Sequence, residues 1–347
     1  MDRLGFFKHG LSSLLDVAQS IIGLKHAADS FTEAVDEALS NIKTDIGLHL
    51  PSLDAQMYQD PQGTICDIAE MGYTLLEVGA YSPGKAQDQS IARLKELADG
   101  AGLKIAGVHI NKLYERPAPQ ENEEADTESQ AAVKETADAK PGAEQTEGAG
   151  KDGTNKEQNH ELDTKAQPDP NAEWWQKALS DAQALGCRYV TMARMPDYPT
   201  DEVVDEYIAY FNLIGELTAE RKMQFCFHPR KVELQRGEDS LSIFDRIAAG
   251  CDPQKVAFQI DTYEATEAGI DILELLNTQG KRVALLHIHD YGIVGESGKI
   301  DLDSIIAKGV RTGVRDIMLE VSDYSMPPKN CVERSLQNVQ NLPSVRF

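Results

Sequence analysis

Four short apolar runs in the second half of the chain each end in a residue that can bind a metal ion. They are MQFCFH, which ends at His228, VAFQID, which ends at Asp261, VALLHIH, which contains His287 and His289, and DIMLE, which ends at Glu320. Each run has the length of a β-strand, and a helix-length stretch separates it from the next. Because the carboxyl ends of parallel strands meet at one rim of a barrel, these side chains are expected to hold one divalent cation. The pattern therefore predicts a metalloenzyme.

The elements that must position these residues form eight strand-then-helix units. The predicted strands cover residues 45–50, 74–79, 104–110, 188–194, 223–228, 256–261, 283–289 and 316–321. Helical stretches are expected at 63–70, 90–99, 173–184, 201–220, 240–249, 270–277, 302–307 and 332–339. Eight alternations predict a closed parallel (β/α)8 TIM barrel, and 347 residues are enough to build one with insertions.

The two-residue period of a strand indicates which side chains point into the barrel. The four ligand candidates fall on inward positions at the strand ends, and the same parity adds residues from the first four strands: Glu77 and His109 on the second and third strands, with His49 and Arg194 at the first and fourth. A single histidine in a strand is more often structural than a ligand. The metal hypothesis therefore depends on candidates from four successive strands.

The stretch DTYEATEAGIDILELLNTQGKRVALLHIHDY, residues 261–291, resembles the sugar phosphate isomerase/epimerase family with the xylose-isomerase-like barrel. Members of this family show a D-x-Y-W-x-x-x-A-G pattern followed by a leucine-rich H-L-K-D strand. Further segments are similar to family segments in the same order, namely residues 46–81, 103–110, 173–190, 211–228 and 317–324. The resemblance covers residues 44–341, apart from an acidic insertion.

The resemblance implies a cation bound by His228, Asp261, His287 and Glu320. Two nitrogen and two oxygen ligands suit Mn²⁺, Zn²⁺, Fe²⁺ or Co²⁺ better than Mg²⁺. Many relatives have Glu-Asn-His or His-Asn-His-Asp at the end of the fifth strand, whereas this chain has His228-Pro229-Arg230-Lys231. This departure puts epimerisation by two carboxylates in doubt.

Two alternatives remain open for the cations of this segment. Arg230 and Lys231 could hold an anionic or polar group of the substrate, or they could form surface ion pairs with Glu233 or Asp239. The remaining substrate contacts are expected from the other polar side chains at the rim, which are His49, Arg194 and His289.

The chemistry expected of such a site is proton transfer next to the carbonyl of a sugar. Glu320 is the first candidate for the catalytic base, with His109 or Glu77 as the partner that returns the proton or holds a hydroxyl. The predicted function is a metal-dependent isomerase or epimerase that acts on a keto- or aldo-sugar through an enediolate. The alternatives are a lyase that catalyses β-elimination on a 3-keto-glycoside and a sugar-binding barrel without catalysis.

Composition excludes several classes of partner. The chain carries 34 basic and 57 acidic residues, a net charge of −23, which disfavours nucleic acids and anionic membranes. No apolar run is long enough to span a membrane. The five cysteines are widely spaced with no CxxC pair, so a reducing, cytoplasmic compartment is the simpler expectation.

Two segments lie outside the barrel pattern. Residues 117–173 contain fifteen acidic residues, five lysines and no aromatic residue, which predicts a disordered acidic insertion spanning 115–172 within the barrel domain, 44–347. It could be a solvated linker or a docking element for a basic partner. In residues 1–43, Phe7, Leu11 and Leu14 begin an amphipathic helical pattern that would pack on the barrel or on a partner subunit of a homo-oligomer. The alternative there is a degenerate twin-arginine export signal.

Overall fold

Eight parallel strands close into a barrel in the computed structural model, which describes residues 45–116, 170–236 and 241–345. Around the barrel the order is β1-β10-β9-β8-β7-β6-β5-β2, and each neighbouring pair is parallel. The strands are β1 (Asp45–His49), β2 (Leu75–Val78), β5 (Lys104–His109), β6 (Tyr189–Met192), β7 (Gln224–Phe227), β8 (Val256–Asp261), β9 (Val283–His289) and β10 (Asp316–Glu320). The predicted (β/α)8 barrel is confirmed, whereas the predicted helix in 1–43 and most of the acidic insertion fall outside the described residues.

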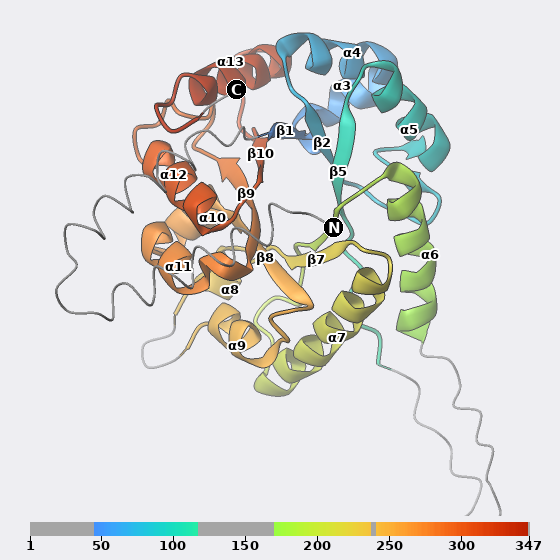
Figure 1. The fold of residues 1–347 in the computed structure, drawn as a ribbon, viewed down its shortest axis with the longest axis vertical. Helices are drawn as coiled ribbons and strands as arrows, with labels where there is room; N and C mark the ends of the chain where they lie inside the picture. Colours follow the sequence, from blue (N-terminus) through green and yellow to red (C-terminus); the bar gives the residue numbers. More distant parts are fainter. Residues whose placement is uncertain (1–44, 117–169, 237–240, 346–347) are drawn as a thin grey trace, which may run out of the picture. The chain divides into compact units, whose positions relative to one another are not determined.

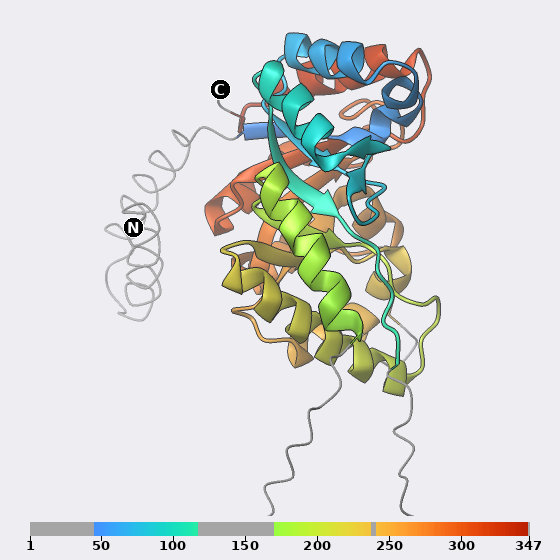
Figure 2. The ribbon, with the colours of Figure 1, turned by 90° about the vertical axis from the view of Figure 1, so that its right-hand side faces the viewer.

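Helices surround the barrel, as Figures 1 and 2 show. One such helix follows each barrel strand, in chain order α4 (Pro61–Met71), α5 (Ile91–Gly100), α6 (Pro170–Leu185), α7 (Asp201–Glu220), α9 (Ile243–Gly250), α11 (Ile272–Gln279), α12 (Leu302–Thr312) and α13 (Pro328–Gln340). Each overlaps a predicted helical stretch. None of the helices in the described ranges is long and apolar enough to cross a membrane.

Short elements in the connections between strands and helices were not predicted. They are η1 (Leu50–Leu53), α3 (Asp54–Gln59), α8 (Lys231–Leu234), α10 (Thr262–Glu267), η2 (Gly280–Arg282) and the hairpin β3 (Lys85–Ala86) and β4 (Gln89–Ser90). Apart from η2, each follows the carboxyl end of a barrel strand. They therefore build the rim at which the candidate residues lie.

Polar residues at the start of the outer helices explain where these helices begin. Ser90 and Asp271 each accept a hydrogen bond from the backbone N–H three residues later, at the first turns of α5 and α11. Ser242 and Asp245 form a reciprocal capping box at the start of α9. Such a cap contributes about 1 kcal/mol to stability, so the local sequence, in addition to packing, determines where these helices begin.

The inside of the barrel contains an apolar layer immediately below the rim. It consists of Leu75, Ala106, Tyr189, Cys226, Ala257, Leu285 and Met318, all buried. Most of these residues precede a rim residue by two positions, as Leu285 precedes His287 and Met318 precedes Glu320. The strand parity expected from the sequence therefore applies, and the polar rim residues rest on a packed floor.

Gly47, two residues before His49, packs against this floor. A β-carbon at this position would clash with the Met318 sulfur and lie 2.9 Å from Cβ of Leu75. We expect Gly47→Ala to lower the free energy of unfolding by about 1–3 kcal/mol, the usual effect of overpacking a core. Denaturant unfolding would measure this change.

Gly100→Ala is the matched control for that measurement. Gly100 is the last residue of α5, and a β-carbon there would meet no heavy atom within 4 Å. Alanine favours helical structure more than glycine does, so the control should unfold at the wild-type denaturant concentration or above it. An equal loss of stability in the two variants would contradict the packing account of Gly47.

Candidate metal centre

The polar residues predicted from the strand ends converge at one rim of the barrel. His49, Asp261, His289 and Glu320 are the last residues of their strands, and His228 directly follows β7. The strand register sets neighbouring side chains at matching heights, since His49 pairs with Glu77, Asp261 with His287 and His289 with Glu320. Several groups of three of these residues have possible ligand atoms within 4.8 Å of one another.

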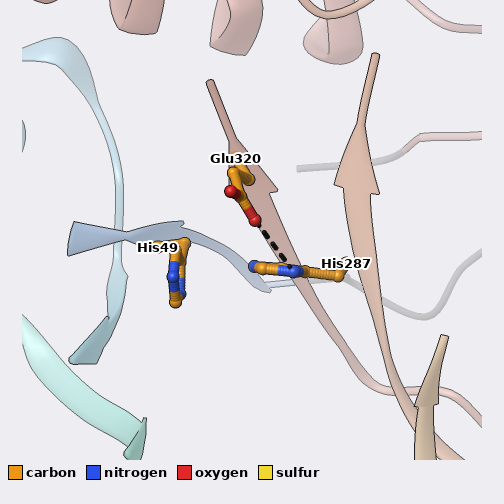
Figure 3. A group of neighbouring side chains, drawn as sticks. All are labelled: His49, His287 and Glu320. Atoms are coloured by element: carbon orange, nitrogen blue, oxygen red, sulfur yellow. Dashed lines mark ion pairs between the residues drawn. The ribbon is translucent and has the colours of Figure 1, made fainter. Parts of the chain in front are cut away.

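The ring of His287 lies close to the other three predicted ligands. Its Nδ1 lies 3.2 Å from Nε2 of His228, 3.4 Å from Oδ2 of Asp261 and 3.3 Å from Oε2 of Glu320. Nε2 of His228 lies 3.8 Å from Oδ2 of Asp261. Figure 3 shows the carboxylate of Glu320 directed at the His287 ring, with His49 on the adjacent strand.

This donor set fits a divalent transition-metal ion. With donors about 2.0–2.2 Å from a metal, neighbouring donors in a tetrahedral site are separated by about 3.3–3.6 Å, close to the spacing seen here. His228, Asp261 and His287 are buried, and the two nitrogens that face each other at the site, Nε2 of His228 and Nδ1 of His287, are 3.2 Å apart. Buried imidazoles close to one another and to two carboxylates are costly without a cation between them.

The pKa shifts follow from the same crowding. Burial acts to lower the pKa of His287, but the carboxylates of Asp261, Glu320 and Glu77 raise it to about 9. Burial and the neighbouring His287 lower the pKa of His228 to about 3. Burial acts to raise the pKa of Asp261, but His287 and His289 hold it well below its usual value. The carboxylate of Asp261 is therefore ionised and His228 is neutral, as metal ligands must be, whereas His287 is protonated and would release its proton on binding a metal.

Asp261 is held in place by the start of α10. Its Oδ1 accepts a hydrogen bond of 2.8 Å from the backbone N–H of Glu264, so Oδ2 is left to face the histidines. The next residue, Thr262, donates its hydroxyl to the carbonyl of His289 at 2.6 Å and accepts the His289 backbone N–H at 3.0 Å. These bonds tie the end of β8 to the end of β9.

His289 lies nearer the mouth than His287. Its Nδ1 is 3.3 Å from Oδ2 of Asp261, and its Nε2 is 2.7 Å from the hydroxyl of Ser322. Ser322 is exposed two residues beyond Glu320. The chain of contacts from Ser322 through His289 to Asp261 can orient the carboxylate from outside the ligand set.

Glu77 lies on the other side of His287. Its Oε2 is 2.8 Å from Nδ1 of His49, 3.1 Å from Nε2 of His109 and 3.4 Å from Nε2 of His287. Burial acts to raise the pKa of Glu77, but His109, His49 and His287 keep it well below its usual value. All three residues predicted from the first, second and third strands therefore belong to one cluster with the ligand candidates.

The cations after β7 are engaged by acidic residues. The guanidinium of Arg230 contacts Glu233 at 2.5 Å, Asp197 at 3.1 Å and the carbonyl of Met195 at 3.2 Å. The ammonium of Lys231 lies 3.1 Å from Glu267. Of the two alternatives, these contacts match ion pairing. Arg230 thereby links the loop after β6 to the loop after β7. Asp239, the other predicted partner, lies outside the described residues.

Arg194 is placed differently from its prediction. β6 ends at Met192, so Arg194 lies two residues beyond the strand and is exposed. The chain leaves the sheet here because the backbone N–H of Ala193 bonds to the side chain of Asn111 and no longer to a neighbouring strand. Arg194 is thus outside the buried cluster.

Two site residues were missed from the sequence. Gln259 donates to Oε1 of Glu77 at 2.9 Å and is fully buried, and Ser322 contacts His289. Both occupy inward positions, two residues before Asp261 and two after Glu320. Extending the parity argument by one step along each strand could have found them.

Comparisons with known proteins agree with the barrel fold. The sequence profile of the family described as "Xylose isomerase-like TIM barrel" matches residues 158–337, just over half of the chain. Comparison with curated proteins gave no match.

Solved structures show the same fold at low identity. A sugar phosphate isomerase/epimerase from Parabacteroides distasonis is 22% identical, with 87% of this chain and 96% of that chain covered and a TM-score of 0.68. A D-allulose 3-epimerase from Methylomonas sp. is 14% identical, with 86% and 98% covered and a TM-score of 0.56. A xylose isomerase domain protein from Alicyclobacillus acidocaldarius is 13% identical, with 86% and 97% covered and a TM-score of 0.58.

Proposed function

The chain belongs to the xylose isomerase-like TIM barrel family, and from this premise we propose that it is a divalent-metal-dependent sugar isomerase or epimerase. The observation that supports the proposal is that His228, Asp261 and Glu320 all lie within 3.4 Å of Nδ1 of His287 at the rim. Neighbours of the same fold, a sugar phosphate isomerase/epimerase and a D-allulose 3-epimerase, support a sugar as the substrate.

The proposed mechanism is proton transfer at the carbon next to a sugar carbonyl. A divalent ion held by the four ligands, Mn²⁺, Zn²⁺, Fe²⁺ or Co²⁺, would draw electron density from the carbonyl and so acidify the neighbouring C–H bond. Glu320 removes that proton as the general base. The C–H electron pair then forms a double bond to the carbonyl carbon while the carbonyl π pair moves onto its oxygen, which gives an enediolate. Reprotonation at the former carbonyl carbon, with loss of the neighbouring hydroxyl proton, gives the isomer, and reprotonation of the first carbon on its other face gives the epimer.

Glu320 is the only carboxylate of the cluster that a substrate can reach readily. Its side chain is 24% exposed, compared with 2% for Asp261 and 0% for Glu77. Burial acts to raise the pKa of Glu320, but His287, His49 and His289 lower it overall, so the group is ionised and able to accept a proton.

His109 and His49 face Glu77 and lie beside this space, and we assign them contacts with the sugar hydroxyls. Arg194, exposed at the rim, is available to an anionic group of a substrate.

The presence of a single accessible carboxylate, Glu320, favours a lyase as the second candidate. Two-base epimerisation needs an accessible acid or base on each face of the substrate carbon, and His228 stands where relatives with the Glu-Asn-His form have a second glutamate. Among the described carboxylates of the cluster, one accessible base remains, which is sufficient for elimination. In that reaction the electrons released by proton removal expel a β-substituent, and a 3-keto-glycoside loses its aglycone.

Deuterium exchange tests the proposal and separates the candidates. Metal-loaded protein incubated in deuterated water with ketoses or 3-keto-glycosides should exchange the hydrogen next to the carbonyl. Mass spectrometry would then show an isomeric sugar of unchanged mass apart from the label, or a released aglycone with an unsaturated keto-sugar. No exchange with any of these substrates at full metal loading would favour a sugar-binding barrel without catalysis.

A further inference from the structure

We infer that Glu77 is a positioning residue, which fixes the tautomers of His49 and His109 so that His49 Nε2 and His109 Nδ1 accept hydrogen bonds from two substrate hydroxyls. The sequence suggested a catalytic role for Glu77. The inference rests on the proposed function in one respect, since the hydroxyls are those of a sugar.

Glu77 is out of reach of a substrate. Its side chain is 0% exposed, and its two carboxylate oxygens face partners from four other strands, of which His287 is the most distant at 3.4 Å. Oε1 accepts the amide of Gln259 at 2.9 Å, and Oε2 faces His49 at 2.8 Å and His109 at 3.1 Å. A buried carboxylate accepts hydrogen bonds and donates none, so the atoms facing it must be donors.

Gln259 fixes the tautomer of His109. Because the amide nitrogen of Gln259 donates to Glu77, its carbonyl Oε1 is the atom that faces Nε2 of His109, at 3.0 Å. Nε2 of His109 therefore contacts two acceptors, the carbonyl oxygen of Gln259 and the carboxylate oxygen Oε2 of Glu77. Two acceptors in contact with one ring nitrogen require that this nitrogen carry a hydrogen.

The same reasoning fixes His49. Its Nδ1 faces Oε2 of Glu77 at 2.8 Å and so carries the hydrogen in the neutral ring. Each neutral imidazole then has one remaining acceptor nitrogen, Nε2 in His49 and Nδ1 in His109. Both side chains keep 9% of their surface exposed, and the ring centroids are 4.7 Å apart, so one sugar can contact both rings.

A second cation bound by His49, Glu77 and His109 is the competing explanation, because the three residues have possible ligand atoms within 4.8 Å of one another. A metal ligand must present a lone pair. Nε2 of His109 would then face the carbonyl oxygen of Gln259 at 3.0 Å with no hydrogen between them, and two acceptors repel at that distance. The amide of Gln259 therefore favours hydrogen bonding over a second ion.

Nitrogen NMR of the ring nitrogens tests the inference directly. The chain has eight histidines, so protein labelled with ¹⁵N-histidine and loaded with diamagnetic zinc gives a tractable spectrum. Single His49→Gln and His109→Gln variants would assign the resonances. We expect His49 to carry its hydrogen on Nδ1 and His109 on Nε2. The opposite tautomer at His109 in the wild-type protein would overturn the inference, and this measurement needs no variant of Glu77 to fold.

Glu77→Gln tests the role of the carboxylate. Glutamine has the shape of glutamate, but one of the two accepting oxygens becomes an NH₂ group that can only donate. The variant therefore cannot accept hydrogen bonds from Gln259, His49 and His109 at the same time. We expect an altered tautomer in at least one of the two histidines, an unchanged single equivalent of zinc, and deuterium exchange about 10- to 100-fold slower, the usual effect of a lost outer-shell partner.

Asp181→Asn is the matched control for this variant. Asp181 is another buried carboxylate with several donors, among them the Tyr81 hydroxyl and the Gly84 backbone N–H, each at 2.8 Å, but it lies on α6 outside the cluster. Its variant should leave both tautomers and the exchange rate unchanged. Two equivalents of zinc in the wild type and one in Glu77→Gln would instead establish a second metal site. The tautomers are measured without substrate, so they decide the positioning role even if no sugar reacts.

Discussion

Asp261→Asn is expected to lower the affinity of the protein for its divalent metal by at least about 100-fold. Loss of a residue that only orients a metal ligand lowers affinity by up to about 100-fold, and loss of a ligand itself should cost at least as much. Oδ2 of Asp261 lies 3.4 Å from Nδ1 of His287 and 3.8 Å from Nε2 of His228, so the substitution removes one of the two charged ligands. Elemental analysis after dialysis against a graded series of chelator concentrations would measure the change.

Asparagine separates metal binding from folding at this position. Oδ1 of Asp261 caps α10 through the backbone N–H of Glu264, and asparagine caps helices as well as aspartate does. The α10 cap should therefore survive in the variant, and any loss of stability would reflect the lost pairing of the Asp261 carboxylate with His287 and His289. Asp271→Ala is the control, because Asp271 caps α11 in the same way but lies away from the cluster. It should cost about 1 kcal/mol of stability and retain full metal.

His287→Ala extends the same test to a second ligand. Its Nδ1 is the atom closest to the other three donors, so its loss should also abolish metal retention. Retention of one equivalent of metal by both Asp261→Asn and His287→Ala would rule out this centre.

The barrel could be predicted from the sequence because each of its signals is local. An apolar run such as VALLHIH has the length of one strand, and its two-residue period places His287 and His289 on the same face as Leu285. Helix starts such as Ser90 and Asp271 depend on contacts within three residues. Eight repeats of these local patterns leave few folds other than a closed parallel barrel.

The connections inside the site could not be predicted because they join residues far apart in the chain. Gln259 and Glu77 are 182 residues apart, and nothing near either residue indicates that they meet. The same holds for the bond between Arg230 and Asp197, which required the loop after β6 to fold back over β7. Strand parity gave the direction of each side chain but not which atoms would touch.

The positions of the carboxylates at the rim limit the possible reactions more strongly than the fold does. Asp261 is fixed by the α10 cap, and Glu77 is enclosed by Gln259, His49 and His109. Within the described part of the cluster, Glu320 is thus the one carboxylate free to approach a substrate carbon. A reaction that removes and returns a proton on one face, or that eliminates a substituent, needs no more than this.

Glu320→Gln is accordingly expected to slow deuterium exchange next to the substrate carbonyl by about two to four orders of magnitude, the usual range for a positioned general base. Glutamine retains the size of the side chain but accepts no proton. Loss of metal could give the same result, because Oε2 of Glu320 lies 3.3 Å from Nδ1 of His287. Metal content must therefore be measured on the same samples, with the ion supplied in excess.

Asp316→Asn provides the matched control on the same strand. Asp316 is a buried carboxylate at the opposite end of β10, where it pairs with Arg188 at 2.9 Å. Residues at that end of a barrel serve stability and not catalysis, so this variant should exchange deuterium at the wild-type rate even if it unfolds earlier. If Glu320→Gln, fully loaded with metal, also exchanged at the wild-type rate, the base would have to be another residue of the rim, and His109 would be the next to replace.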